Sequence, residues 1–245
     1  MRWFSDTVCV FRIQLMSMRT EIGPFLLAAL VFPSAMYLFA NAVSRREATG
    51  QAQLRFLAGS IVFSLSLTSI SWLGYLLLEN RFTGRLRLFE TLPLAPSSYI
   101  CGFLVFAFVQ TSMSTAALLF IARLFGVQMQ PSLLPLAVVV TLTVLCLCGL
   151  GTVIAARARS FTEGSLLTDA LGAGLVFLAP VFYTPEMLPH GLRTVSQLLP
   201  TTFAAVAVEK TLTGSHAIVS NVIVLGLMAV ATLLLGFRLT EWREN

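Results

Sequence analysis

Charged residues are scarce in this chain of 245 residues: Asp, Glu, Lys and Arg make up 11% of it, whereas 57% is hydrophobic. A water-soluble globule of this size needs more polar surface, so a soluble fold is excluded. The mean hydropathy of +0.86 indicates that lipid is the main solvent. The net charge of +5 comes from fifteen Arg and one Lys spread over many loops, which is too diffuse for a nucleic-acid-binding surface.

The chain also lacks the usual sequence motifs of an enzyme. It contains no G-x-x-x-x-G-K-[ST] nucleotide loop, no H-E-x-x-H zinc motif and no G-x-S-x-G nucleophile elbow. The two histidines, His190 and His216, stand apart near predicted span ends. Cys146 and Cys148 are two residues apart, so they face different sides of a helix. We therefore expect no catalytic residue, disulfide, metal site or cofactor in this chain.

Long hydrophobic runs predict an all-α membrane protein with six transmembrane helices. A helix needs about 20 apolar residues to cross the hydrocarbon core of a bilayer. The predicted spans are residues 22–40, 56–78, 98–122, 132–156, 166–184 and 211–237, of which 166–184 meets this requirement only marginally. We expect residues 1–245 to form a single transmembrane domain.

Residues 1–20 have the pattern of an amphipathic helix, with Arg12 and Arg19 on its flank. Its apolar face consists of Phe4, Val8, Phe11, Leu15 and Met18. This pattern favours a helix that lies in the membrane interface, with a solvated tail as the alternative.

Residues 185–209 do not fit the pattern of a span. Pro185, Pro189 and Pro200 divide this segment into pieces too short to cross a bilayer. Broken backbone is tolerated at membrane depth where protein or a wet cavity shields it. We therefore expect a re-entrant hairpin before the last span, with a seventh span over residues 187–209 as the alternative.

A short charged segment, residues 79–97, separates the second and third predicted spans. Gly84 is placed to end the preceding helix, and Pro93 and Pro96 end whatever forms after it. Phe82, Leu86, Phe89 and Leu92 recur at roughly helical spacing. On such a helix Arg85 projects toward this apolar side, and Arg87 and Glu90 share the polar side. The pattern predicts a short helix across the loop, exposed to a partner outside the membrane. We call residues 79–97 the docking segment.

The distribution of positive charge predicts the orientation. Six spans place both termini on the same side as the docking segment and residues 157–165. That side carries ten Arg, against six Arg or Lys on the other. The positive-inside rule therefore predicts that the termini and the docking segment are cytoplasmic.

The second span carries a stripe of hydroxyl groups at spacings of 4, 4, 3 and 4 residues, which lie on one helical face. The stripe consists of Ser60, Ser64, Thr68, Ser71 and Tyr75. A polar stripe is not expected to face lipid. Two interpretations stay open: hydrogen-bonded packing against a neighbouring helix, or one wall of a translocation path.

Three ionisable residues are candidates for a gate. Asp169 lies near the start of the predicted fifth span, and a carboxylate within a membrane is a functional-site hypothesis. Glu209 and Lys210 are adjacent near the predicted outer side. The alternatives are that Asp169 reaches interfacial water and that the other two line a solvated mouth.

The order of these features resembles a known family. The stretch GRLRLFETLP from Gly84 to Pro93, with Gly102 about nine residues later, resembles the cytoplasmic loop of type-2 ATP-binding-cassette (ABC) exporter permeases. The segment from Pro180 to Gly214 is similar to the fifth-span and re-entrant region of that family. The interface helix, the six spans and the chain length are also similar, so the resemblance covers nearly the whole chain.

The resemblance implies a half-transporter with no enzymatic activity of its own. Two permease subunits, identical or paralogous, would each sit on a separate ATPase subunit that binds ATP and Mg²⁺. The docking segment would act as a coupling helix, with Arg85, Leu86, Arg87, Phe89 and Glu90 contacting the ATPase. The implied substrates are drugs, lipids, glycolipids, polysaccharides or haem, moved out of the cytoplasm across a bacterial inner membrane.

Two rival functions remain open from the sequence. The haem-exporting permease of cytochrome c maturation has a similar size and a similar Glu-Thr-Leu-Pro loop. An ion-coupled secondary transporter would use Asp169 as its ion site, although no convincing inverted repeat is visible.

Overall fold

The structure is a computed structural model that describes residues 2–20, 23, 26–44, 50–85, 96–183, 185–215 and 217–239. Within these ranges all regular secondary structure is helical. Five helices are long and apolar enough to cross a membrane: Ala52–Phe82, Ser97–Leu124, Leu133–Arg157, Phe161–Leu178 and Val219–Leu239. The predicted all-α membrane class is therefore confirmed, and the chain is an integral membrane protein.

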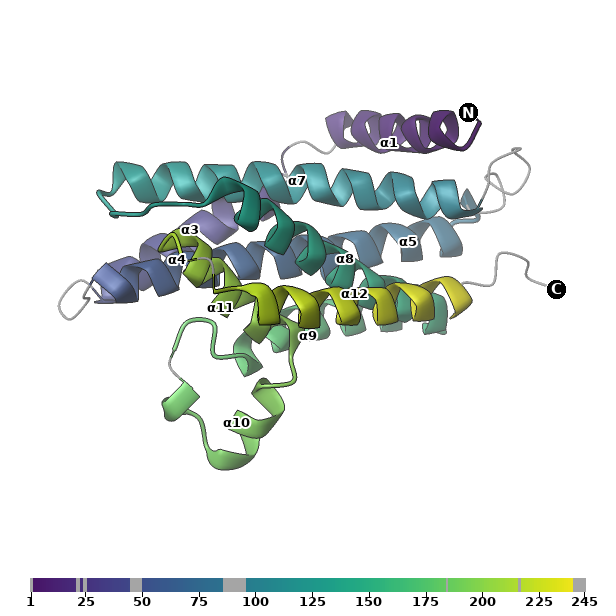
Figure 1. Ribbon diagram of the computed structural model, residues 1–245. Helices are drawn as coiled ribbons and strands as arrows, with labels where there is room; N and C mark the ends of the chain where they lie inside the picture. Colours follow the sequence, from purple (N-terminus) through teal and green to yellow (C-terminus); the bar gives the residue numbers. More distant parts are fainter. Residues whose placement is uncertain are drawn as a thin grey trace.

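The longest apolar helix, in the middle of the bundle, is built from three consecutive elements. These are α4 (Gly50–Ser66), the π-helical turn η2 (Leu67–Trp72) and α5 (Leu73–Phe82). The helix contacts α7 (Pro96–Leu124), α8 (Leu133–Arg157) and α9 (Phe161–Leu178). It is therefore in direct contact with three of the other long helices of the bundle (Figure 1).

The predicted first span, 22–40, falls partly on residues outside the described ranges. Its described part consists of the π-helical turn η1 (Leu27–Val31) and α3 (Phe32–Ser44), which packs on α4. The helix thus extends four residues beyond the predicted end at residue 40. The six-span layout remains a prediction.

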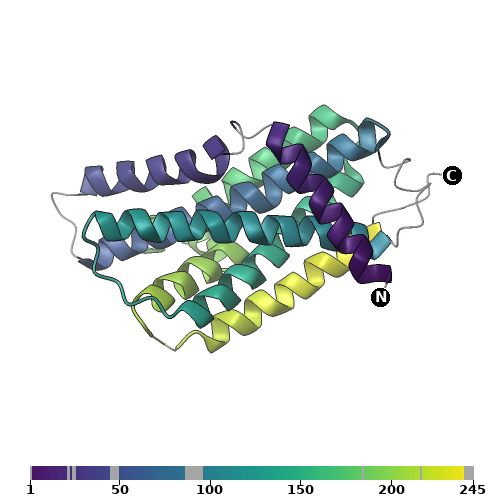
Figure 2. The same cartoon turned by 90° about the horizontal axis from the view of Figure 1, so that it is seen from above.

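The long helices run between two ends of the bundle. At one end, α5 finishes at Phe82, α7 begins at Pro96 and α12 (Val219–Leu239) finishes, and α1 (Arg2–Thr20) also starts there (Figures 1 and 2). We call this the docking end, because the docking segment connects α5 to α7. At the far end, α4 begins and α7 turns into α8 (Figure 1). The two ends of the described chain thus lie on the same side of the bundle (Figures 1 and 2).

The N-terminal helix α1 lies across α7 (Figure 2). Thr7, Val10 and Gln14 face α7 and are buried, whereas Phe4 is 71% exposed and Leu15 is also exposed. The apolar face predicted from the sequence is therefore largely the outer face, which suits a helix lying in the membrane interface. A second, narrower face that holds the helix on α7 was not predicted.

Close packing of α1 depends on Gly102 of α7. A Cβ atom at this position would lie 2.6 Å from Cγ1 of Val10 and 3.2 Å from the carbonyl oxygen of Thr7. The indole of Trp3 donates a hydrogen bond of 3.0 Å to Ser97 one turn earlier on α7. The lack of a side chain at Gly102 therefore allows α1 to pack directly on α7.

We expect Gly102→Leu to displace α1 from α7, because the new side chain has no room beneath Val10. Overpacking of this kind costs roughly 1–3 kcal/mol. Limited trypsin digestion in mild detergent should then cleave after Arg12 faster than in the wild type. Val109→Leu, at an exposed position of the same helix, is the control. An unchanged cleavage rate in Gly102→Leu would contradict this role.

The fourth of the apolar helices, α9, runs from Phe161 to Leu178, whereas the fifth span was predicted at residues 166–184. Its start is fixed by a capping box: Ser160 accepts a hydrogen bond from the Glu163 N–H, and the Glu163 carboxylate accepts one from the Arg159 N–H. The polar residues of this first turn lower the hydropathy, which is why a hydropathy window places the start too late.

The region predicted as a re-entrant hairpin, 185–209, contains a single 3-10 turn η3 (Pro185–Met187) and two short helices, α10 (His190–Ser196) and α11 (Pro200–Leu212). Helix α10 projects from the side of the bundle, whereas α11 packs against α4, α8 and α12 (Figure 1). Gly214, at φ +74°, follows α11, and the last helix begins at Val219 rather than at the predicted residue 211. The re-entrant path itself remains a prediction.

Candidate functional site

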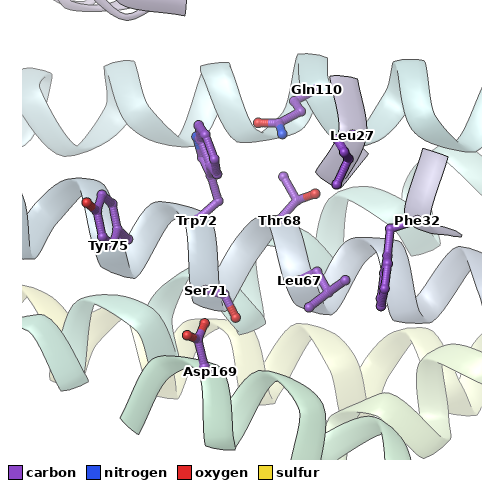
Figure 3. Close-up of a pocket in the computed structure, with 9 residues that line it drawn as sticks. All are labelled: Leu27, Phe32, Leu67, Thr68, Ser71, Trp72, Tyr75, Gln110 and Asp169. Carbon is purple, nitrogen blue, oxygen red and sulfur yellow. The ribbon is translucent and has the colours of Figure 1, made fainter. Parts of the chain in front are cut away.

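A pocket of about 310 Å³ lies beside the middle of the long central helix, bordered by η1, α3, η2, α5, α7 and α9 (Figure 3). Most of its wall is apolar or aromatic. Its lining residues are Leu27, Phe32, Leu67, Thr68, Ser71, Trp72, Tyr75, Gln110 and Asp169.

The π-helical turn η2 supplies four of these residues, Leu67, Thr68, Ser71 and Trp72. A π turn is wider than an α turn and is frequently found at functional sites. Neighbouring helices approach it through glycines: a Cβ on Gly151 of α8 would lie 3.2 Å from the Ser69 carbonyl oxygen. The unusual backbone is thus covered on one side by protein and open to the pocket on the other.

Across the pocket from η2 lies η1, which contacts it. Pro33 is the second residue of α3. As a proline it has no N–H to donate to the carbonyl four residues earlier. The Phe32 N–H instead bonds to the carbonyl of Leu27, five residues back. The chain before Pro33 therefore forms a widened turn that lines the pocket.

The carboxylate of Asp169 lies at the pocket wall, and Figure 3 shows it pointing from α9 toward Ser71. Since α9 begins at Phe161, Asp169 occupies the middle of the helix, not the start predicted from the sequence. The side chain is exposed in the single chain, and neither of the two ion pairs found among the described residues involves it.

The amide of Gln110 reaches the pocket from α7, on the other side of η2 from Asp169 (Figure 3). Gln110 is 3% exposed, and its Oε1 has no hydrogen-bond partner. An unpaired buried acceptor costs free energy in a protein interior, and more so in a membrane. The sequence analysis missed this residue; the available signal was a lone amide within the apolar run 98–122.

The predicted hydroxyl stripe divides into two parts. Ser60 bonds to the carbonyl of Phe56 within its own helix, whereas Ser64 lies 2.6 Å from the hydroxyl of Ser114 on α7 and joins the two helices. Thr68, Ser71 and Tyr75 line the pocket. The contact of Ser64 fits the packing interpretation, and Ser71 also donates a hydrogen bond of 3.4 Å to the Thr168 carbonyl on α9. A translocation path along the stripe stays a prediction.

The three candidate gate residues do not come together. Glu209 and Lys210 lie in the last turn of α11, at the far end, where Glu209 pairs with Arg55 of α4 at 3.5 Å. The ammonium of Lys210 donates to the carbonyl of Ala217 at 3.0 Å. A backbone hydrogen bond of 3.1 Å also joins the Gln130 N–H to the carbonyl of Leu212 there. These contacts hold the last turn of α11 at the far end, whereas Asp169 lines the pocket. A gate formed by these residues stays a prediction.

At the docking end, the structure describes the beginning of the docking segment. Helix α5 ends at Phe82, and Gly84, with φ +75°, turns the chain as predicted. Arg85 follows and pairs with Glu79 at 3.2 Å across this turn. The other predicted coupling residues lie outside the described ranges: Leu86, Arg87, Phe89 and Glu90.

A residue that the sequence analysis did not single out connects the docking end to the rest of the bundle. Arg81, in the last turn of α5, donates hydrogen bonds to the carbonyls of Ala155, Ala156 and Ala158 at 2.8, 3.1 and 3.1 Å. These carbonyls belong to the end of α8 and the corner before α9. A cation at this position also interacts favourably with the helix dipole of α8.

The described residues contain no group of three or more His, Cys, Asp or Glu side chains that could hold a metal ion.

In a comparison with known families, the model of the ABC-2 type transporter family matches residues 9–213, which is more than half of the chain. Among curated proteins, none matches this chain.

Proposed function

Because the chain belongs to the ABC-2 type transporter family, we propose that it is the membrane subunit of an ATP-driven exporter for an amphiphilic or hydrophobic substrate. ABC-2 membrane domains are permease subunits without catalytic activity, and they work with ABC ATPase partners. In our proposal, two copies of a separate ATPase bind ATP and Mg²⁺ and drive substrate out of the cytoplasm. The membrane is the bacterial cytoplasmic membrane, with both termini inside.

The continuity of the helix from Gly50 to Phe82 supports this proposal most directly. Its last turn, residues 79–82, is the beginning of the docking segment, and its middle lines the pocket. Arg81 bonds this helix to the corner between α8 and α9, and α9 carries Asp169. A movement imposed on the docking segment by an ATPase would therefore reach both walls of the pocket.

A second permease subunit is part of the proposal, and α9 supports it. This helix is largely exposed in the single chain, with Leu166, Leu171 and Phe177 outside. It also exposes Asp169, and membrane-embedded carboxylates face protein or wet cavities rather than lipid. A second copy or a paralogue packed near α9 would shield this carboxylate from lipid.

The proposal predicts that the ATPase co-purifies with the tagged protein in mild detergent from its native host. Reversing two charges of the docking segment, by Arg87→Glu together with Glu90→Arg, should reduce this co-purification at least about tenfold, since interfacial charge pairs contribute several kcal/mol. Recovered ATPase is measured by nucleotide-dependent activity and mass spectrometry of the eluate.

The matched control reverses Arg45 and Glu47, which lie between the first and second predicted spans and outside the docking segment. This control should retain the ATPase. A wild-type protein that elutes without an ATPase and moves solute in liposomes on an ion gradient would contradict the proposed function and favour a secondary transporter.

A further inference from the structure

The pocket has a charge that the described protein does not balance. Asp169 is the only charged residue among those that line it, and no described Lys or Arg pairs with it. The rest of the wall is apolar, aromatic or uncharged polar. An isolated charge beside an apolar wall is unfavourable within a membrane unless a counter-charge accompanies it.

We propose that this pocket binds a substrate with a protonated amine on an apolar, ring-bearing body. The amine lies at Asp169, where an N–H donor forms a charge-assisted hydrogen bond with the carboxylate. Identification of this ligand with the exported substrate rests on the proposed function. The binding itself requires only the pocket.

The aromatic residues of the pocket favour a cationic ligand. The rings of Trp72 and Tyr75 both line the cavity and come from the same stretch of the central helix as Ser71, toward which Asp169 points (Figure 3). Aromatic faces attract cations, and the attraction strengthens when water is excluded. Leu27, Leu67 and Phe32 supply a surface for the apolar body of the ligand.

The same features disfavour several classes of substrate that the family resemblance leaves open. Phosphate-bearing lipids and haem carry negative charges, which Asp169 would repel. A polysaccharide needs a polar wall, whereas this wall is mainly apolar. A volume of about 310 Å³ suits a small drug-sized molecule, because such pockets measure about 300–1,000 Å³.

Equilibrium dialysis can test this with two naphthyl compounds of opposite charge, propranolol as the protonated amine and naproxen as the carboxylate. The full-length protein is placed in phosphatidylcholine nanodiscs without any ATPase, and binding to empty nanodiscs is subtracted. We expect saturable binding of propranolol and at least about tenfold weaker binding of naproxen. Equal binding of both compounds, or no saturable binding of propranolol, would overturn the proposal without use of any variant.

The variant Asp169→Asn removes the charge at constant volume and should weaken propranolol binding about tenfold. Asp169→Glu keeps the charge and should retain most of the binding. Glu163→Gln removes a carboxylate from the same helix outside the pocket, so it should bind as the wild type does. Propranolol binding that survives Asp169→Asn unchanged would show that the carboxylate plays no part.

The binding experiment and the ATPase co-purification test different proposals. Amine binding without an associated ATPase would support the proposed pocket ligand and contradict the proposed exporter function. An associated ATPase without amine binding would support the exporter function and contradict the proposed ligand.

Discussion

Replacement of Arg81 with alanine is expected to reduce ATP-driven transport at least about tenfold while the ATPase stays bound. Arg81 is the direct hydrogen-bonded link from the end of α5 to the corner between α8 and α9. Hydrogen bonds that involve a charged group contribute roughly 1.5–3 kcal/mol each. Without them, movement of the docking segment would no longer be transmitted to the α9 wall of the pocket.

The measurement combines efflux from vesicles that contain the protein and its ATPase with co-purification of the two. Arg157→Ala is the matched control, because Arg157 is an exposed cation in the last turn of α8, at the same corner. This control should transport normally. Arg81→Lys keeps the charge but not the planar guanidinium and should give intermediate transport.

Two results would contradict this role of Arg81. Normal efflux in Arg81→Ala would show that coupling takes another route. Loss of the ATPase from this variant would instead place Arg81 in the docking surface itself.

The second large effect is expected in the contact between α8 and α12. These helices share an extensive interface in which small residues let the backbones approach. A Cβ on Gly149 would lie 2.7 Å from Cβ of Thr232 and 2.8 Å from the backbone nitrogen of Leu233. The hydroxyl of Thr232 bonds to the carbonyl of Cys146 at 3.1 Å in the same contact.

We expect Gly149→Leu to destabilise the protein by about 3 kcal/mol, because backbone atoms of α12 cannot yield to the new side chain. In a chain of this length such a loss lowers Tm by about 10 °C. Size-exclusion chromatography after stepwise heating in mild detergent measures it as the temperature at which the monodisperse peak is lost.

Gly226→Leu provides the control for this prediction. Gly226 lies on α12, and a Cβ there would meet no atom within 4 Å. The control should melt close to the wild type. If both variants melt alike, the close approach at Gly149 is not what holds α8 and α12 together.

Hydropathy predicted most of the long helices from the sequence, because each is apolar over about 20 residues. The predicted ends of the helices were wrong where the hydrogen bonds or backbone conformation of single residues, and not the average hydropathy, determine where a helix begins. The capping box at Ser160 starts α9 in a polar turn, and Gly214 delays the start of the last helix to Val219. Such boundaries depend on hydrogen bonds of single residues, which a window average does not detect.

The candidate site was predicted only in part. Ser71, Tyr75 and Asp169 were identified because polar groups stand out within apolar spans. Arg81 and Gln110 were not, because their importance depends on contacts with α8 and with the pocket, which involve residues far apart in the chain. The division of the hydroxyl stripe was also unpredictable, since the spacing rule assumes 3.6 residues per turn throughout.

The π turn from Leu67 to Trp72 makes the number of residues in the turn, and not only their types, a determinant of this site. A π turn accommodates one residue more than an α turn. If the chain were one residue shorter here, an ordinary α-helix would form with Leu73 and Arg81 facing almost as they do now, because five residues of an α-helix turn through about the same angle as six of a π-helix. The extra residue therefore changes which side chains the turn presents to the pocket, and not the direction in which Arg81 faces.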